Sequence, residues 1–270
     1  MTGPQAVAAR IVPRTHKAGR GATRILERNF LVYRRIWLIV FSGFFEPLFY
    51  LFSIGIGLGR LVGDVDTGGR VVEYAAYVAP ALLAAAAMNG AIYESTFNIF
   101  FKVRYGRVYD AILSTPMHPL DIAIGEITWS LGRGAVYASG FLVVAAVMGL
   151  LHSAWAVAAI PAAVLIGFAF AACGMAATTF MTSWQDLEVV NLLTLPMFLF
   201  SATFYPLSVY PKAFQVLTQF SPLYHGVELV RALTLGAFDW TIAGHIAFLV
   251  AMGLAGLTIA NRRLEKLLLS

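Results

Sequence analysis

The sequence predicts an all-α, polytopic membrane protein, and two observations carry this prediction. Hydrophobic residues make up 59% of the chain and charged residues only 12%, whereas a soluble domain is about half apolar and carries about 25% charged residues. The apolar residues also fall in long blocks, near the roughly 20 residues that a membrane-spanning helix needs. Spans of that length leave little of the 270 residues for a separate soluble domain.

Six transmembrane helices are expected. They lie at about residues 36–59, 74–99, 122–150, 156–181, 189–204 and 241–260. Residues 1–22 are rich in Gly, Ala, Pro and Arg, which predicts a disordered basic tail. The membrane domain is expected to cover residues 23–266.

The segment at residues 23–35, TRILERNFLVYRR, alternates apolar and basic residues at near-helical spacing. This pattern predicts an amphipathic helix that lies on the membrane surface with its arginines toward lipid phosphates. The alternative is that the segment is only the solvated start of the first span.

The placement of the basic residues indicates the topology. Eight of the 19 Lys and Arg residues fall in the first 35 positions, and others follow in the 100–121 segment and near the C-terminus. The positive-inside rule then puts both termini in the cytoplasm of a multi-pass protein of the cell membrane. Nucleic-acid binding is the other interpretation of the net charge of +5. It is not expected, because the basic N-terminal segment lacks interleaved aromatic residues and leads directly into a span.

Four residues of the charged types Asp, Glu, Lys and Arg lie within or at the ends of the expected spans: Glu46, Glu94, Glu126 and Arg133. A charge at the centre of a span costs about 2.5 kcal/mol or more unless it is paired or hydrated, so Glu46 should face protein or water. Arg133 can extend toward the headgroups, and it lies seven residues from Glu126 on roughly the same helix face. All four are candidates for the transport path or its gate.

The segment at residues 100–121 is too polar for lipid and joins the second and third spans. Its run RVYDAIL favours a short helix, which Pro116 and Pro119 then end, and Asp121 is placed to cap the third span. An ordinary solvated loop is the alternative.

Residues 205–240 carry too much charge for an ordinary span and contain three prolines. They predict a broken, partly re-entrant helical element on the outer side, between spans 5 and 6. His225, Glu228 and Arg231 recur every three residues, which indicates either a local polar network or a substrate site. Tyr205 is either part of the gate or a residue of the interfacial aromatic belt.

No motif in the chain indicates an enzyme or a metal site. The five histidines fall in different segments, and Cys173 is the single cysteine, so no metal-ligand cluster is expected. There is also no GxxxxGK[ST] loop to bind ATP phosphates. If the protein is an active transporter, its energy must come from a partner.

Two stretches are similar to one known family. They are YGRVYDAILSTPMHPLDIAIGE (residues 105–126) and LPMFLFSATFYPLSVYPKAFQVLTQFSPLYHGVELVRALTLG (residues 195–236). Both resemble patterns of the membrane subunits of ABC-2 type exporters, in particular the lipo-oligosaccharide (nodulation factor) and daunorubicin-type export permeases. The chain departs from the second pattern at Ala202, where glycine is usual.

The resemblance implies that two membrane subunits, identical or related, pair and that each binds a separate ABC ATP-binding subunit. ATP and magnesium then bind to that partner, and no cofactor is expected on this chain. The segment 23–35 corresponds to the family's connecting helix, and 100–121 to the coupling segment that docks on the ATPase. The resemblance narrows the docking element to a helix at about Val103–Leu113. The expected coupling residues are Arg104, Gly106, Arg107, Asp110, Pro116 and Asp121. The outer element that closes the transport path contains the gating candidates Tyr205, Pro206, His225, Glu228 and Arg231.

The leading hypothesis is therefore a permease that exports an amphipathic substrate such as a lipid-linked saccharide, a glycolipid or a hydrophobic drug. One alternative is a membrane-embedded, lipid-modifying enzyme, but it needs a polar catalytic cluster where the sequence offers only isolated acids. The other is a channel-like oligomer without an ATPase. A neighbouring reading frame with a phosphate-binding loop would favour the exporter.

Overall fold

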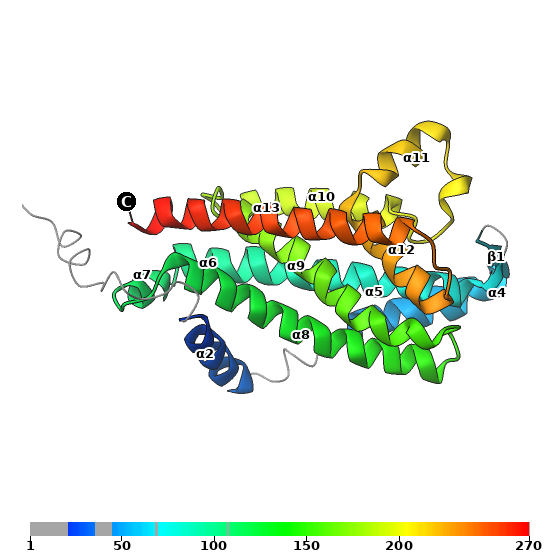
Figure 1. Ribbon diagram of the computed structural model, residues 1–270, viewed down its shortest axis with the longest axis horizontal. Helices are drawn as coiled ribbons and strands as arrows, with labels where there is room; N and C mark the ends of the chain where they lie inside the picture. The colour runs from blue at the N-terminus through cyan, green and yellow to red at the C-terminus, as the bar shows by residue number, and fades with distance from the viewer. Residues whose placement is uncertain (1–20, 36–44, 68–69, 107, 270) are drawn as a thin grey trace, which may run out of the picture.

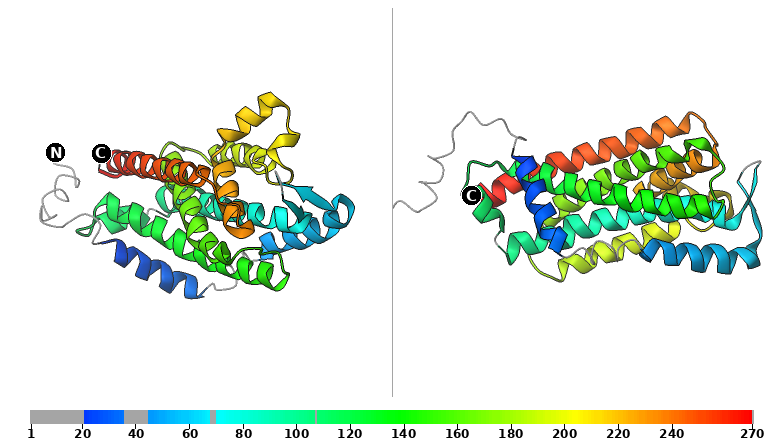
Figure 2. Two further views of the ribbon diagram at one scale, coloured as in Figure 1. Left: turned by 45° about the vertical axis from the view of Figure 1, so that its right-hand side comes forward. Right: turned by 90° about the horizontal axis from the view of Figure 1, so that it is seen from below.

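Lipid offers no hydrogen-bond partners to the backbone, so long apolar segments in a bilayer fold as helices that satisfy their own amides. A computed structural model describes residues 21–35, 45–67, 70–106 and 108–269, and its long helices run side by side in an elongated bundle (Figures 1 and 2). Five helical segments in the described part are long and apolar enough to cross a membrane. They are Phe45–Val62, Tyr74–Arg104, Pro119–Val147, Ala154–Thr178 and Thr241–Leu267.

The α-helices follow one another with few other elements. They are α2 (Ala22–Arg35), α4 (Gly59–Val62), α5 (Tyr74–Tyr93), α6 (Ile99–Arg104), α7 (Val108–Leu113), α8 (Pro119–Val147), α9 (Ala159–Thr178), α10 (Asp186–Phe200), α11 (Lys212–Gln219), α12 (Pro222–Leu235) and α13 (Thr241–Leu269). The π-helical and 3-10 segments are η1 (Leu51–Leu58), η2 (Glu94–Asn98), η3 (Ala154–Ala158) and η4 (Leu207–Val209). The strands β1 (Asp64–Asp66) and β2 (Val71–Glu73) pair antiparallel, with Asp64 opposite Glu73.

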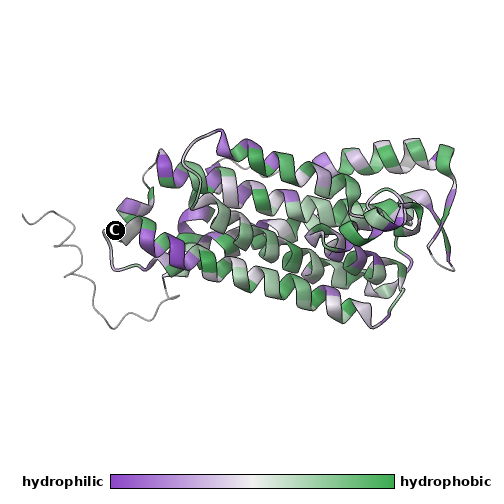
Figure 3. Cartoon of the chain, turned by 90° about the horizontal axis from the view of Figure 1, so that it is seen from above, coloured by the Kyte–Doolittle hydropathy of each residue, from purple (hydrophilic) through white to green (hydrophobic). Residues whose placement is uncertain are grey.

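The core of the bundle is formed mainly by α5 and α9, most of whose alanines are almost fully buried. Small residues let neighbouring backbones approach closely. A Cβ added to Gly256 of α13 would lie 2.7 Å from the backbone nitrogen of Cys173 in α9. Hydrophobic positions dominate the middle of the long helices, and hydrophilic ones gather toward their ends (Figure 3). This distribution is that of a helical membrane protein.

A π-helical segment, η2, interrupts the second long helix between α5 and α6. A π turn holds one residue more than an α turn and leaves a carbonyl without its usual partner. Here the Thr178 hydroxyl of α9 donates to the Ser95 carbonyl oxygen at 2.9 Å. The neighbouring helix thus satisfies the irregular backbone.

The expected spans overlap the observed helices, with shifted ends. Of the expected span 36–59, residues 36–44 lie outside the described residues, and the helix continues to Val62. The expected span 189–204 overlaps α10, whose 15 residues extend about 22 Å, less than the roughly 30 Å of a hydrocarbon core. It ends at Phe200 because Ala202 takes a positive φ of 55° and turns the chain. Of the expected tail 1–22, only Gly21 and Ala22 are described.

The bundle has two distinct ends (Figure 1). The first, here called the α7 end, holds α2, α6, α7, the start of α8 and the end of α13. The second, the α11 end, holds α4, the β1–β2 hairpin, α11 and the start of α13. At the α11 end, Arg70 donates to the Leu235 carbonyl oxygen at 2.9 Å, which ties the hairpin to the last turn of α12.

Candidate functional site

A single buried carboxylate, Glu126, joins four elements at the α7 end. Its side chain is almost fully buried in the first turns of α8. Lys102 of α6 donates to both carboxylate oxygens at 2.9 and 2.8 Å, Asn29 of α2 donates at 2.9 Å, and the Tyr109 hydroxyl of α7 donates at 3.1 Å. Burial, and next the Glu126 charge, raise the pKa of Tyr109 well above its usual value, so Tyr109 stays a donor. A buried charge is stable when it is paired and its lone pairs are satisfied, as here.

The helix α2 docks on α8 beside this carboxylate. A Cβ added to Gly125 would lie within 3.0 Å of the Ala22 carbonyl oxygen and even closer to Ile25, so only glycine permits this approach. The Asp121 carboxylate accepts from the backbone nitrogen of Gly21 at 3.0 Å and from that of His118 at 2.8 Å. The sequence placed Asp121 at the start of the third span, but α8 begins at Pro119 and its N-cap is His118. Asp121 binds the N-cap backbone from the third helical position, as in a capping box, and also holds the start of α2.

A second buried ion pair lies further from the α7 end. Arg133 of α8 donates to Glu94 of η2, and the Tyr33 hydroxyl of α2 donates to the same carboxylate at 3.0 Å. The Arg133 guanidinium also lies 5.2 Å from the centre of the Tyr33 ring, a cation–π contact. Asn98 completes the group, because its amide contacts both Glu94 and Tyr33.

The two ion pairs link the second and third spans at two successive levels along the bundle. Glu126 and Arg133 share one face of α8, as the seven-residue spacing predicts, and each meets a residue of the second span. Their partners, Lys102 and Glu94, lie eight residues apart. Two α-helical turns take about 7.2 residues, and the extra residue of the π turn in η2 brings both partners onto one face.

The expected coupling residues fall into two groups. Gly106, Asp110 and Pro116 are exposed around α7, and Arg107 lies outside the described residues. Asp121 is buried, while Arg104 donates to the Met181 carbonyl oxygen at 2.7 Å beyond the end of α9. The expected helix from about Val103 to Leu113 is instead split, because the chain turns at Gly106, whose nitrogen donates to the Phe101 carbonyl oxygen at 2.8 Å.

The α11 end holds a buried arginine, Arg231 of α12. It pairs with Glu228 and donates to the Ala202 carbonyl oxygen at 2.8 Å, and its guanidinium lies 4.0 Å from the centre of the Tyr77 ring. The Tyr77 hydroxyl donates to the same carbonyl at 3.2 Å. Together they hold the turn that ends α10 at Ala202, the position where the resembled family usually has glycine.

The structure separates the other residues expected at this end. His225 does not join Glu228 and Arg231, because its Nδ1 lies 2.8 Å from the Nδ1 of His245 in α13. Tyr205 is exposed, and its ring lies tilted against that of Tyr210 with ring centres 4.9 Å apart. Pro206, which follows Tyr205, is half-buried.

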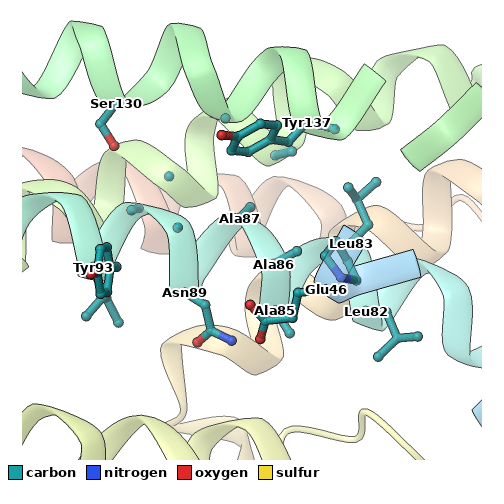
Figure 4. A pocket seen from close by; sticks show the side chains of 18 of the residues that line it. Glu46, Leu82, Leu83, Ala85, Ala86, Ala87, Asn89, Tyr93, Ser130 and Tyr137 are labelled. Atoms are coloured by element: carbon teal, nitrogen blue, oxygen red, sulfur yellow. The ribbon is translucent and has the colours of Figure 1, made fainter. Parts of the chain in front are cut away.

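A cavity of about 700 Å³ opens between the helix at Phe45–Val62 and α5, α8, α9 and α10 (Figure 4). Most of the side chains that line it are apolar or aromatic. The polar ones are Glu46, Asn89, Ser130, Arg133, Tyr137, Asn191 and Thr194 together with Tyr50 and Tyr93. Among the ionisable residues expected in the spans, Glu46 and Arg133 line this cavity, whereas Glu94 and Glu126 do not.

Reasoning from the sequence missed the partners of the buried acids. Lys102, Asn29, Tyr109, Tyr33 and Asn98 complete the two carboxylate networks. The signal that could have found Lys102 is its opposite charge to Glu126 on the neighbouring span. Within the described ranges, no group of three or more His, Cys, Asp or Glu residues could hold a metal ion.

A bundle of long apolar helices with buried ion pairs and an internal cavity has the architecture of a polytopic membrane protein. The family pattern of the ABC-2 type transporter matches residues 22–235, so the chain belongs to the ABC-2 transporter family. It is also similar to nodulation protein J of Rhizobium leguminosarum bv. viciae, with 30% identity over 90% of this chain and 94% of that protein. Nodulation protein J of Rhizobium meliloti (strain 1021) is 30% identical over 91% of this chain and 93% of its own length.

As a member of this family, the chain is a membrane permease of an ABC exporter. It is a transport subunit, and the family implies an ABC ATP-binding subunit as its partner.

Proposed function

We propose that this chain is the membrane subunit through which a separate ATPase drives the export of an amphipathic substrate. The observation that carries the proposal is the Glu126 network. It ties exposed α7 to α2 and to the two helices that line one side of the cavity. An ATPase that moves α7 therefore moves the ends of the second and third spans with it.

The proposal includes the topology. Six spans cross the cell membrane, and both termini lie in the cytoplasm with the α7 end. The fifth span, α10, is shorter than the hydrocarbon core, so the bilayer thins locally around it. The segment at residues 205–240 is the outer, re-entrant element, and α12 packs back against α5 and α9. Positive charge near the termini supports this orientation.

The α7 helix is suited to transmit a push because its two faces differ. Tyr109 is buried and donates to Glu126, while Asp110 beside it is exposed and available to a partner protein. ATP and magnesium bind to the ATPase, two permeases pair, and closure of the ATPases on ATP shifts the cavity from inward-facing to outward-facing. The apolar lining of the cavity, interrupted by amides and hydroxyls, suits a substrate with an apolar body and a polar head.

The test measures coupling between the two subunits. The chain is purified with a candidate ABC ATP-binding subunit, reconstituted in liposomes, and assayed for ATP hydrolysis. We expect the permease to stimulate hydrolysis, and we expect Asp110→Lys to abolish that stimulation without unfolding the chain. Asp64→Lys is the matched control, because Asp64 is equally exposed but lies on the hairpin at the α11 end.

Equal stimulation by the wild type and Asp110→Lys would contradict the role of α7. The orientation is tested separately in a Cys173→Ala background, which removes the single cysteine. In intact cells an impermeant maleimide should label the Asp64→Cys variant and not the Asp110→Cys variant. The reverse pattern would overturn the proposed topology.

A further inference from the structure

Of the charged side chains that line the cavity in the described part of the chain, one is neutralised by an ion pair and the other is not. Two of the described residues that line it are charged, Glu46 and Arg133. Arg133 is already neutralised by its ion pair with Glu94, and its side chain is only 14% exposed. Glu46 is exposed toward the cavity, and the described residues place no hydrogen-bond donor or cation on it. The undescribed residues just before it, 36–44, contain no Lys, Arg or His.

The surroundings of Glu46 match a ligand that is both cationic and apolar. Tyr50 lies one helical turn after Glu46 and its ring is 6.0 Å from that of Phe198 in α10. In another part of the cavity lining, Tyr93 and Phe97 stack with ring centres 4.9 Å apart. Aromatic ring faces attract cations, and a carboxylate at membrane depth is unfavourable until it is hydrated or paired.

The polar groups near Glu46 do not compensate its charge. Figure 4 shows the Glu46 carboxylate and the Asn89 side chain pointing toward the same part of the cavity, beside Ala85 of α5. An amide contributes a dipole and no net charge. A cationic head placed here would meet the carboxylate directly, while its apolar body would lie against Leu82, Leu83 and the aromatic rings.

We propose that Glu46 makes this cavity a binding site for amphipathic cations, compounds with an ammonium-like charge attached to an apolar body. The inference deepens the proposed function, since it names the class of compound that the exporter selects, but binding itself requires no ATPase. Neutral compounds of the same shape would bind more weakly, because they leave the carboxylate unpaired, and anions would be excluded.

Two hydrophobic ions of nearly the same shape and opposite charge provide the test. The purified full-length chain in nanodiscs is titrated with tetraphenylphosphonium and, in parallel, with tetraphenylborate, and the uptake by empty nanodiscs is subtracted. We expect saturable binding of tetraphenylphosphonium only. The Glu46→Gln variant, nearly identical in shape, should bind it at least about tenfold more weakly, whereas Glu46→Asp should keep most of the affinity.

Glu73→Gln is the matched control, because Glu73 is an exposed carboxylate of the hairpin and does not line the cavity. Size-exclusion chromatography shows whether each variant stays folded. Glu46→Gln is expected to fold, because it removes a charge that is costly within a membrane span. Unchanged cation affinity in Glu46→Gln, equal binding of the two ions, or no saturable binding to the wild type would each overturn the inference.

The same variants separate this inference from the proposed function. If Glu46→Gln loses cation binding and the wild-type chain stimulates its ATPase, the cation site and the proposed function both stand. If the chain stimulates no ATPase but binds the cation in a Glu46-dependent way, the proposed function fails and the binding site remains. Stimulation without Glu46-dependent binding refutes the site alone.

Discussion

At the α7 end a buried acid is shared by four elements, whereas at the α11 end a buried base holds one turn of backbone. Glu126 receives donors from α2, α6 and α7. Arg231 instead pairs with Glu228 of its own helix and donates to the carbonyl of Ala202. The first arrangement fixes helices relative to one another, and the second stabilises a local break in one helix.

The difference predicts how far the damage from each substitution spreads. Loss of the Glu126 charge leaves Lys102 unpaired and weakens at once the hydrogen bonds that α2, α6 and α7 make to α8 through this carboxylate. Loss of the Arg231 guanidinium affects only the turn at Ala202, whose carbonyl oxygen it binds. Three substitutions test this contrast.

The largest effect is expected for Glu126→Gln. Breaking a buried ion pair by removing one partner costs about 3–5 kcal/mol, and the amide cannot satisfy all the donors that the carboxylate accepts. Unfolding of the purified chain in mixed micelles measures the loss, and protease sensitivity of α2 and α7 shows its spread.

The matched control is Glu27→Gln, which breaks the exposed pair with Arg24 on α2. That pair contributes about 0.2–1 kcal/mol. Similar losses for Glu126→Gln and Glu27→Gln would show that the buried network does not hold the α7 end together.

A smaller effect is expected for Arg231→Lys. Lysine keeps the charge but lacks the planar guanidinium group, which binds Glu228 and the Ala202 carbonyl oxygen at the same time. One charge-assisted hydrogen bond is therefore lost, which lowers the free energy of unfolding by about 1.5–3 kcal/mol. Hydrogen exchange should rise at residues 200–206 and stay unchanged in α2 and α7. The exposed Arg60→Lys serves as the control, and faster exchange at the α7 end in Arg231→Lys would refute the local role.

The smallest effect, and a favourable one, is expected for Ala202→Gly. A non-glycine residue with left-handed backbone costs about 1–2 kcal/mol, and Ala202 has a φ of 55°. Glycine should raise the midpoint of thermal unfolding by about 2–4 °C. Ala111→Gly, at an exposed helical position in α7, should lower stability by about 1 kcal/mol. A loss of stability in both variants would show that the turn imposes no strain at Ala202.

Much of the fold could be predicted from the sequence because lipid imposes simple rules on it. Long apolar blocks mark the helices, and the amphipathic run at residues 23–35 coincides with α2 to within one residue. Prediction failed at the helix ends, because the conformation of a single turn determines where each helix stops. Nothing local marks Ala202 as left-handed, and the split between α6 and α7 depends on the packing around Gly106.

The sequence by itself determined that this is a helical membrane protein with a few ionisable residues in and around its spans, since the cost of charge in lipid makes each of them conspicuous. Only the tertiary structure decided how they pair. Lys102 meets Glu126 and Arg133 meets Glu94 because a π turn in η2 rotates the second span by one residue, and Gly125 lets α2 bring Asn29 within reach. Such pairings depend on the rotation and approach of whole helices, which no spacing within one helix specifies.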